Sequence, residues 1–326
     1  MIAPYLINYP WLVDLLCLVV VPLTFILIGC LWRRRARRRQ HSSRVILPVM
    51  VLLAILSAGA YLYGKYVGSR QLEVRRVTLA FDTLPQAFDG YRIVQLSDIH
   101  AGSMDSLFLR RVVDSVNAVH PDLIVITGDM QNAIPQELEP LLPTLKRLKA
   151  ADGICSVMGN HDYGDYSFLD EREKLNNRGR LMGFQIDMDW HIMNNSRRFI
   201  RRSDQRIVIG GMENDGEGRF PELGNVQQAL EGANRSDFVV MLEHDPTSWR
   251  RKILRHCHAQ LTLSGHTHGG QIAFFGWTPA SLRYRECNGV YWMGDRCINV
   301  TKGIGGAIPV RIGVTPEIVV ITLKKK

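Results

Sequence analysis

Five short apolar runs, each followed by side chains able to bind a metal, constrain the fold of this 326-residue chain more than any other feature. They cover residues 92–96, 123–126, 154–158, 238–242 and 261–263. Apolar runs of this length, bounded by Gly, Asp or Asn, are typical of strands buried on both faces. Ligands gather at the carboxyl ends of such strands in open α/β sheets, so we expect the side chains after the runs to meet in one site. These side chains are Asp98, His100, Asp129, Asn160, His161, His244, His266 and His268.

The first 70 residues differ in composition from the rest of the chain. Residues 11–32 are apolar apart from Asp14, and residues 45–64 contain no charge. Each stretch is long enough to cross a bilayer core of about 30 Å as a helix. We therefore predict a transmembrane hairpin over residues 1–70 with an Arg-rich loop at 33–44, followed by a folded domain over 71–326. Asp14 lies near the expected membrane surface, which favours a structural role for it.

The positive charge of the chain is concentrated in the predicted hairpin. Residues 1–70 carry nine basic side chains against Asp14, so the remaining chain carries only +1 of the total +9. A domain so close to neutrality lacks the basic surface that a nucleic-acid partner requires. The positive-inside tendency places the Arg-rich loop in the cytoplasm and the domain on the outer, periplasmic side of the cell (inner) membrane, although Lys65 and Arg70 weaken this asymmetry.

The domain itself has an alternating strand and helix pattern. Residues 74–81 and 206–210 have the composition of strands, and residues 107–119, 136–148 and 226–230 have helical apolar spacing. After residue 268 the pattern becomes rich in strands. The pattern predicts an α/β domain whose sheets lie between helices.

The expected site residues suit two metal ions. Asp98 and His100 are two apart at a strand end, so both side chains can point to one face, and His266 and His268 repeat this spacing. Gly128 allows a sharp turn that presents Asp129. Such nitrogen and oxygen ligands favour Mn²⁺, Fe²⁺ or Zn²⁺ over Ca²⁺. Two such ions, about 3.5–4 Å apart, would hold a bridging hydroxide and both oxygens of an in-line phosphate displacement.

The order of these blocks resembles the calcineurin-like metallophosphoesterase family over residues 74–324. The blocks after residue 264, Gly-His-Thr-His-Gly-Gly-Gln and Arg311 to Ile318, are similar to a bacterial membrane-associated branch with phosphodiesterase-like proteins and UDP-2,3-diacylglucosamine hydrolases. The resemblance implies a β-sandwich flanked by helices, in α/β/β/α layers. It also implies two divalent ions, among which we favour manganese.

The resemblance further implies a role for each site residue. Asp129 would bridge the two ions, and His161 would remain as the general acid that protonates the leaving oxygen, with Asp162 as a candidate to orient it. The first ion would be held by Asp98, His100, Asp129 and His268, and the second by Asp129, Asn160, His244 and His266.

The leading hypothesis is a membrane-anchored phosphoesterase that hydrolyses a phosphodiester or monoester, EC class 3.1, with a substrate that is lipid-linked or otherwise bound to the envelope. One alternative is a pyrophosphatase for UDP-2,3-diacylglucosamine-type lipids, and a less favoured one is an inactive scaffold. The motif His256-Cys257-His258 precedes a predicted strand, so we expect a structural role there. Cys287 and Cys297 flank a predicted hairpin, where a disulfide and two free thiols are both compatible with the sequence.

Overall fold

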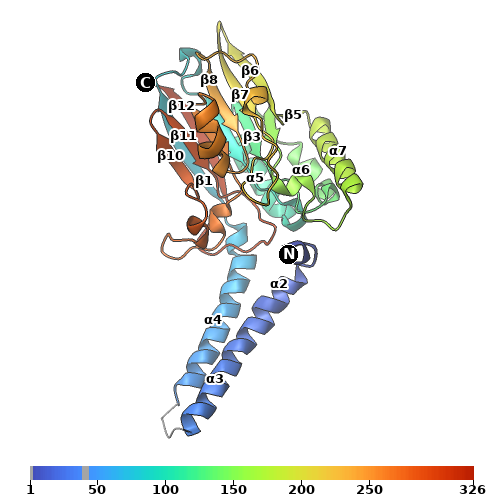
Figure 1. Cartoon of the computed structure of the whole chain (residues 1–326), viewed down its shortest axis with the longest axis vertical. Helices are drawn as coiled ribbons and strands as arrows, with labels where there is room; N and C mark the ends of the chain where they lie inside the picture. Colours follow the sequence, from blue (N-terminus) through green and yellow to red (C-terminus); the bar gives the residue numbers. More distant parts are fainter. Residues whose placement is uncertain (1–2, 39–43) are drawn as a thin grey trace.

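The computed structural model describes residues 3–38 and 44–326 of the chain. It consists of a two-sheet domain and a long helical hairpin that projects from one end of it (Figure 1). The hairpin enters the domain through β1, so its position defines one pole of the domain, called the hairpin pole below.

Two six-stranded sheets form the centre of the domain. In spatial order the first contains β1 (Glu73–Phe81), β12 (Glu317–Lys325), β2 (Arg92–Leu96), β3 (Leu123–Thr127), β4 (Ile154–Val157) and β5 (Trp190–Ile192). The second contains β10 (Gly289–Met293), β11 (Arg296–Val300), β9 (Leu261–Ser264), β8 (Phe238–Leu242), β7 (Gln205–Gly211) and β6 (Ser196–Arg202). The five apolar runs therefore form β2, β3, β4, β8 and β9.

The two sheets face each other across a mainly apolar layer, with side chains such as Ile93, Val125, Val240 and Leu263 completely buried between them. Helices cover the outer faces: α5 (Ser106–Ala118), α6 (Leu142–Leu145) and α7 (Glu171–Asp187) on the first sheet, and α8 (Val226–Ala229), a π-helical turn η7 (Trp249–Ile253) and α9 (Leu254–His256) on the second. Short 3₁₀ turns complete the domain at Gln86–Phe88, Ala101–Ser103, Asn160–Tyr163, His268–Gly270 and Pro279–Leu282. The layer order α/β/β/α confirms the predicted fold class.

Strand directions decide which pole carries the site. β1 starts next to the hairpin and runs away from it, β12 is parallel to β1, and β2 is antiparallel to β12. β2 therefore runs back toward the hairpin, and β3 and β4 are parallel to β2. The carboxyl ends of these strands, and the side chains that follow them, lie at the hairpin pole.

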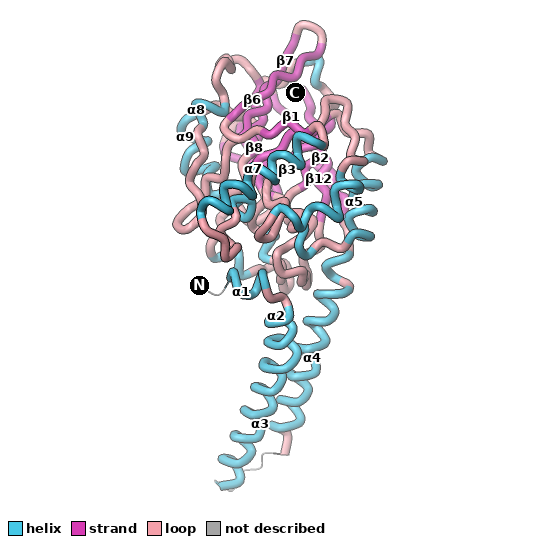
Figure 2. The backbone as a smooth tube through the Cα atoms, turned by 90° about the vertical axis from the view of Figure 1, so that its right-hand side faces the viewer, coloured by secondary structure: helices cyan, strands magenta, loops and turns pink. Residues whose placement is uncertain are grey.

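The N-terminal helices pair along most of their length (Figure 2). The first arm comprises α1 (Ala3–Asn8), α2 (Trp11–Leu15), a π-helical turn (Leu16–Val20) and α3 (Val21–Arg38), and the second comprises α4 (Ile46–Tyr66) with a 3₁₀ turn at Gly68–Arg70. Helices spanning Trp11–Arg38 and Ile46–Arg70 are long and apolar enough to cross a membrane. Arg33 to Arg38 continue the helix instead of forming a loop, and 39–43 of the predicted loop lie outside the described residues. Asp14 accepts hydrogen bonds from Tyr61 and Lys65, so it links the two arms.

The second arm is in direct contact with the domain. The backbone N–H of Arg311 donates to the carbonyl of Gly64 at 3.1 Å, and Val310 packs against Val13 and Tyr61. A Cβ atom on Gly64 would lie 2.8 Å from both Val310 and Ile312. Only a residue without a side chain therefore permits this close approach of helix and domain.

Two local expectations are settled by the structure. The predicted helix 136–148 is broken into a 3₁₀ segment (Pro135–Leu141) and α6, because Pro140 and Pro143 remove backbone donors. Cys287 and Cys297 are both free thiols. The register pairs Cys297 with Trp292, whereas Cys287 precedes the first residue of β10, so the two lie at opposite ends of the hairpin.

Candidate metal centre

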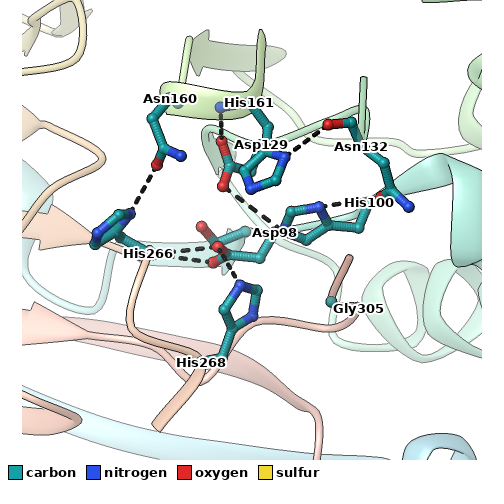
Figure 3. Close-up of polar contacts among 12 residues, drawn as sticks. Asp98, His100, Asp129, Asn132, Asn160, His161, His266, His268 and Gly305 are labelled. Carbon is teal, nitrogen blue, oxygen red and sulfur yellow. Dashed lines mark hydrogen bonds and ion pairs between the residues drawn. The ribbon is translucent and has the colours of Figure 1, made fainter. Parts of the chain in front are cut away.

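The structure brings the eight predicted side chains together at the hairpin pole, between the ends of the two sheets. Figure 3 labels all of them except His244. They come from five separate strand ends, and the groups nearest the centre are almost completely withdrawn from solvent. Asp98, His100 and His244 are fully buried, and His161 retains 8% exposure. The site is thus a set of polar groups largely withdrawn from solvent, and the side chain of His268 keeps 16% exposure at its edge.

An unusual backbone conformation presents most of these groups. Five of the eight residues have positive φ angles between 49° and 72°, a region that residues other than glycine rarely adopt. They are Asp98, His100, Asp129, His266 and His268. Each such turn costs about 1 kcal/mol or more, and such strain is found mainly at functional sites. The chain therefore turns sharply directly after β2, β3 and β9, so that the side chains there point across the gap between the sheets.

The first cluster contains Asp98, His100, Asp129 and His268. His268 Nε2 lies 3.6 Å from Asp98 Oδ1, and His100 Nε2 lies 3.6 Å from Asp129 Oδ2. His100 Nε2 is buried and has no hydrogen-bond partner among the residues that the structure describes. Ligands about 2.1 Å from one ion lie roughly 3–3.5 Å apart. The spacing and the orphaned nitrogen both fit a cation.

The second cluster contains Asp129, Asn160, His244 and His266. His244 Nε2 lies 3.2 Å from both Asp129 Oδ2 and Asn160 Oδ1, and Asn160 Oδ1 lies 2.8 Å from His266 Nδ1. His244 Nδ1 donates to the carbonyl of Thr127 at 2.7 Å. When the ring is neutral, Nε2 therefore carries a lone pair, which faces the oxygens of Asp129 and Asn160. Such a group of acceptors needs a positive charge at its centre.

The electrostatics of the site agree with this interpretation. Burial lowers the pKa of His100 to about 3 and that of His266 to about 4, so both rings are neutral and keep a lone pair for an ion. Burial raises the pKa of Asp98 to about 6. Burial also disfavours charge on His244, but the carboxylates of Asp129 and Asp98 outweigh it and raise its pKa to about 10. A positive charge is therefore favoured between these carboxylates.

Asn132 orients two of the histidines and is absent from the sequence prediction. Its side-chain Oδ1 is 3.1 Å from His100 Nδ1, and its backbone carbonyl is 2.7 Å from His161 Nδ1. Since both groups are acceptors, each histidine carries its proton on Nδ1 and directs Nε2 into the site. The only sequence signal was a polar residue three positions after Asp129.

The expectation that Asp162 orients His161 is wrong. The carboxylate of Asp162 accepts backbone N–H groups of Asp129, Met130, Gln131 and Gly159 at 2.9–3.3 Å. It therefore fixes the loop that presents the bridging carboxylate. The ring of His161 instead stacks on Tyr166, with centroids 3.9 Å apart and planes inclined by 7°.

Other neighbours of the site were also missed. Tyr284 Oη lies 2.9 Å from His266 Nε2, and Arg311 donates to the carbonyl of His268 at 2.7 Å. Both come from the C-terminal segments, far from the strands that supply the ligands, so spacing gave no indication of them. By contrast, Cys257 and His258 hydrogen-bond to the carbonyls of Ile253 and Asp237, away from the site, which fits the structural role expected for their motif.

Comparisons with known proteins identify the family of the chain. The family model for calcineurin-like phosphoesterases matches residues 91–270, more than half of the chain. The uncharacterized metallophosphoesterase YkuE of Bacillus subtilis is 31% identical over 83% of this chain and 92% of its own length. A transmembrane protein with a metallophosphoesterase domain from Danio rerio is 30% identical over 84% of this chain and 62% of its own length. Among solved structures, a dimetal phosphatase from Danio rerio aligns with a TM-score of 0.41 and 13% identity over 66% of this chain and 88% of that one. The chain therefore belongs to the calcineurin-like phosphoesterase family.

Proposed function

We propose that the chain is a membrane-anchored phosphoesterase, EC class 3.1, that hydrolyses a phosphodiester or monoester with two divalent ions, among which we favour Mn²⁺. The observation that carries this proposal is the pair of acceptor clusters that share Asp129 Oδ2. When bound, the ions would lower the pKa of a water molecule and neutralise phosphate charge. Asp98, His100, Asp129 and His268 would hold one ion, and Asp129, Asn160, His244 and His266 the other.

His161 has the properties required of the general acid. Its Nδ1–H is held by the carbonyl of Asn132, so only Nε2 can exchange a proton with a substrate. As general acid, Nε2 would first take up a proton. Burial lowers the pKa of His161, so the protonated ring would transfer that proton readily to a leaving alkoxide. Stacking on Tyr166 and the edge-on contact with His100 restrict the ring to one orientation.

The membrane anchor is the N-terminal hairpin. Its far end carries the arginines from Arg33 to Arg38, and the positive-inside tendency places that end in the cytoplasm. The catalytic domain at the other end would then face the periplasm of the inner membrane. Protease added to intact spheroplasts should digest the domain, and protection of the domain until the membrane is opened would contradict this orientation.

Hydrolysis by the purified full-length chain tests the activity. Bis(p-nitrophenyl) phosphate and p-nitrophenyl phosphate should release nitrophenolate with added Mn²⁺, and chelation should abolish the release. Lack of hydrolysis with Mn²⁺, Fe²⁺ and Zn²⁺ in turn would refute the proposal. A panel that adds nucleotide-linked lipid pyrophosphates decides between this activity and the pyrophosphatase alternative, because the preferred substrate has the larger kcat/KM.

A further inference from the structure

A single residue, Arg311, connects the metal centre to the end of the second arm. Arg311 bonds through its backbone to Gly64 of α4 and through its guanidinium to the carbonyl of His268. About 20 helical residues span a bilayer core, so α4, which starts at Ile46, leaves the core near Tyr66. The hairpin pole of the domain is therefore level with the membrane surface, and the site lies directly above that surface.

An exposed apolar surface lies beside this contact with the hairpin. Ile272 pairs with Ile312, so the segment that follows Ile272 is fixed beside the contact with Gly64. This segment exposes four large apolar side chains, which we call the apolar rim: Phe274, Phe275, Trp277 and Leu282. Phe275 is fully exposed at a positive φ angle in the turn closed by the pairing of Phe274 with Trp277. Aromatic side chains in a group of this kind are enriched where proteins meet a membrane surface.

A cavity of about 230 Å³ joins the second metal cluster to the N-terminal helix. It is lined by Asn160, Tyr166, Arg219 and Phe220 of the domain and by Ala3 and Pro4 of α1. α1 lies at the base of the domain (Figure 2), where Asn8 donates to the carbonyl of Tyr166 at 2.8 Å. A wall of the cavity is thus supplied by a segment that continues directly into the first membrane-crossing arm.

The mouth of the site also carries positive charge, from Arg219 and Arg283, beside the carboxylate of Asp165, which lines the same cavity. Arg219 and Arg283 are exposed and both lie over the ring of Phe220, with guanidinium-to-centroid distances of 5.5 and 5.4 Å. Phe220 in turn contacts His266 edge-on at 4.8 Å. Two guanidinium groups beside the metal ligands can bind a phosphate group, while the apolar rim next to them suits acyl chains.

We propose that the apolar rim inserts into the surface of the bilayer that holds the hairpin, and that the site takes its phosphoester from a lipid of that leaflet. The headgroup would enter the cavity beside Asn160 and Arg219 while the acyl chains stay in the membrane. This inference rests on the proposed phosphoesterase activity for the substrate, but the position of the rim is independent of that activity.

Depth-dependent fluorescence quenching tests the position of the rim. The full-length chain is placed in phosphatidylcholine nanodiscs with and without brominated acyl chains. Trp277→Phe should lower the bromolipid-quenchable emission, whereas Trp292→Phe should leave it unchanged. The quenchable emission that remains in Trp277→Phe comes from Trp11 and Trp32 of the hairpin. Trp292 is a matched control because it is 46% exposed, against 53% for Trp277, but contacts Phe81 at the pole opposite the hairpin. An unchanged quenchable emission in Trp277→Phe would overturn the proposal.

Hydrolysis of two esters with the same scissile bond tests the substrate class. One is the p-nitrophenyl ester of dioleoyl phosphatidic acid in nanodiscs, and the other is its soluble dibutanoyl analogue, both with Mn²⁺. The double variant Phe275→Ser, Leu282→Ser should lower the rate on the long-chain ester by about tenfold, since each apolar side chain contributes several-fold to membrane partitioning. Its rate on the short-chain ester should stay within about twofold.

The outcomes separate the two proposals. A control variant at the opposite pole, Trp292→Ser with Met293→Ser, should hydrolyse both esters as the unaltered chain does. If the unaltered chain hydrolyses neither ester, the proposed function fails, and the lipid substrate fails with it. If it hydrolyses the short-chain ester but the rim variant loses no activity on the long-chain ester, or loses the same on both, the inference alone is overturned.

Discussion

Asn132 provides the sharpest test of how the metal centre is built. The variant Asn132→Leu has nearly the same size but removes the acceptor for His100 Nδ1–H, while the backbone carbonyl that holds His161 remains. Without an ion the ring of His100 can move its proton to Nε2, which faces Asp129 Oδ2 at 3.6 Å. Binding an ion through Nε2 obliges the proton to stay on Nδ1, where the variant offers no acceptor.

The expected loss follows from that buried, unpaired N–H group. Leaving a buried donor unsatisfied costs about 1–3 kcal/mol. Because roughly 1.4 kcal/mol corresponds to a factor of ten, affinity for the ion should fall about 5- to 150-fold. This range overlaps the roughly 10- to 100-fold effect typical of groups that orient metal ligands.

Isothermal titration of the metal-free chain with Mn²⁺ measures this loss. The matched control is Asn299→Leu, which removes another buried asparagine, one that donates to Gln95 at 2.7 Å between the sheets. Both variants should lower the melting temperature, but only Asn132→Leu should weaken Mn²⁺ binding. Equal affinities in the two variants would show that Asn132 does not determine the tautomer of His100.

Three further predictions concern other parts of the chain. His161→Ala should lower turnover about 10²–10⁴-fold with unchanged metal content by elemental analysis, and loss of metal would contradict its role as the acid. Gly68→Ala would place a Cβ atom 2.0 Å from a backbone oxygen of the domain and should lower the melting temperature in detergent, whereas Gly59→Ala, with no atom within 4 Å, should not; equal melting temperatures would refute the contact. Burial disfavours charge on Glu317, but the guanidinium of Arg75 at 3.0 Å outweighs it and holds the pKa below its usual value. Its contribution to stability is therefore present above pH 4.5 and lost as the pH falls below it, so the melting-temperature difference between the unaltered chain and Glu317→Gln should shrink on acidification; a difference independent of pH would refute this.

The strand ends were predictable because their physical causes are local. A run such as 123–126 is uniformly apolar because β3 is covered on both faces, and Gly128 with Asp129 marks its end. Parallel strands then bring such ends to one edge, so convergence of the side chains follows from the order of the runs. The general position of the site and the layers of helices were accessible on the same grounds.

The groups that adjust the site were not accessible in this way. Asn132, Tyr284 and Arg311 act through hydrogen bonds to residues 18 or more positions away, and no periodicity records such contacts. The error over Asp162 has the same origin, because a carboxylate next to His161 in sequence was turned instead toward four backbone amides. The positive φ angles at the strand ends also left no trace in residue type, since most of these positions are Asp or His rather than Gly.

Arg311 makes hydrogen bonds both to Gly64 of the hairpin and to His268 of the site, and this affects how the enzyme can be handled. A version cut before Glu73 to avoid detergent would lose the carbonyl that holds this residue and uncover Val310 and Ile312, which now pack on the helices. Such a shortened protein would be prone to self-association. Its kinetics would describe a site in which Arg311 and the segment of His268 are less firmly held. Measurements in nanodiscs are therefore the reference against which any soluble fragment has to be judged.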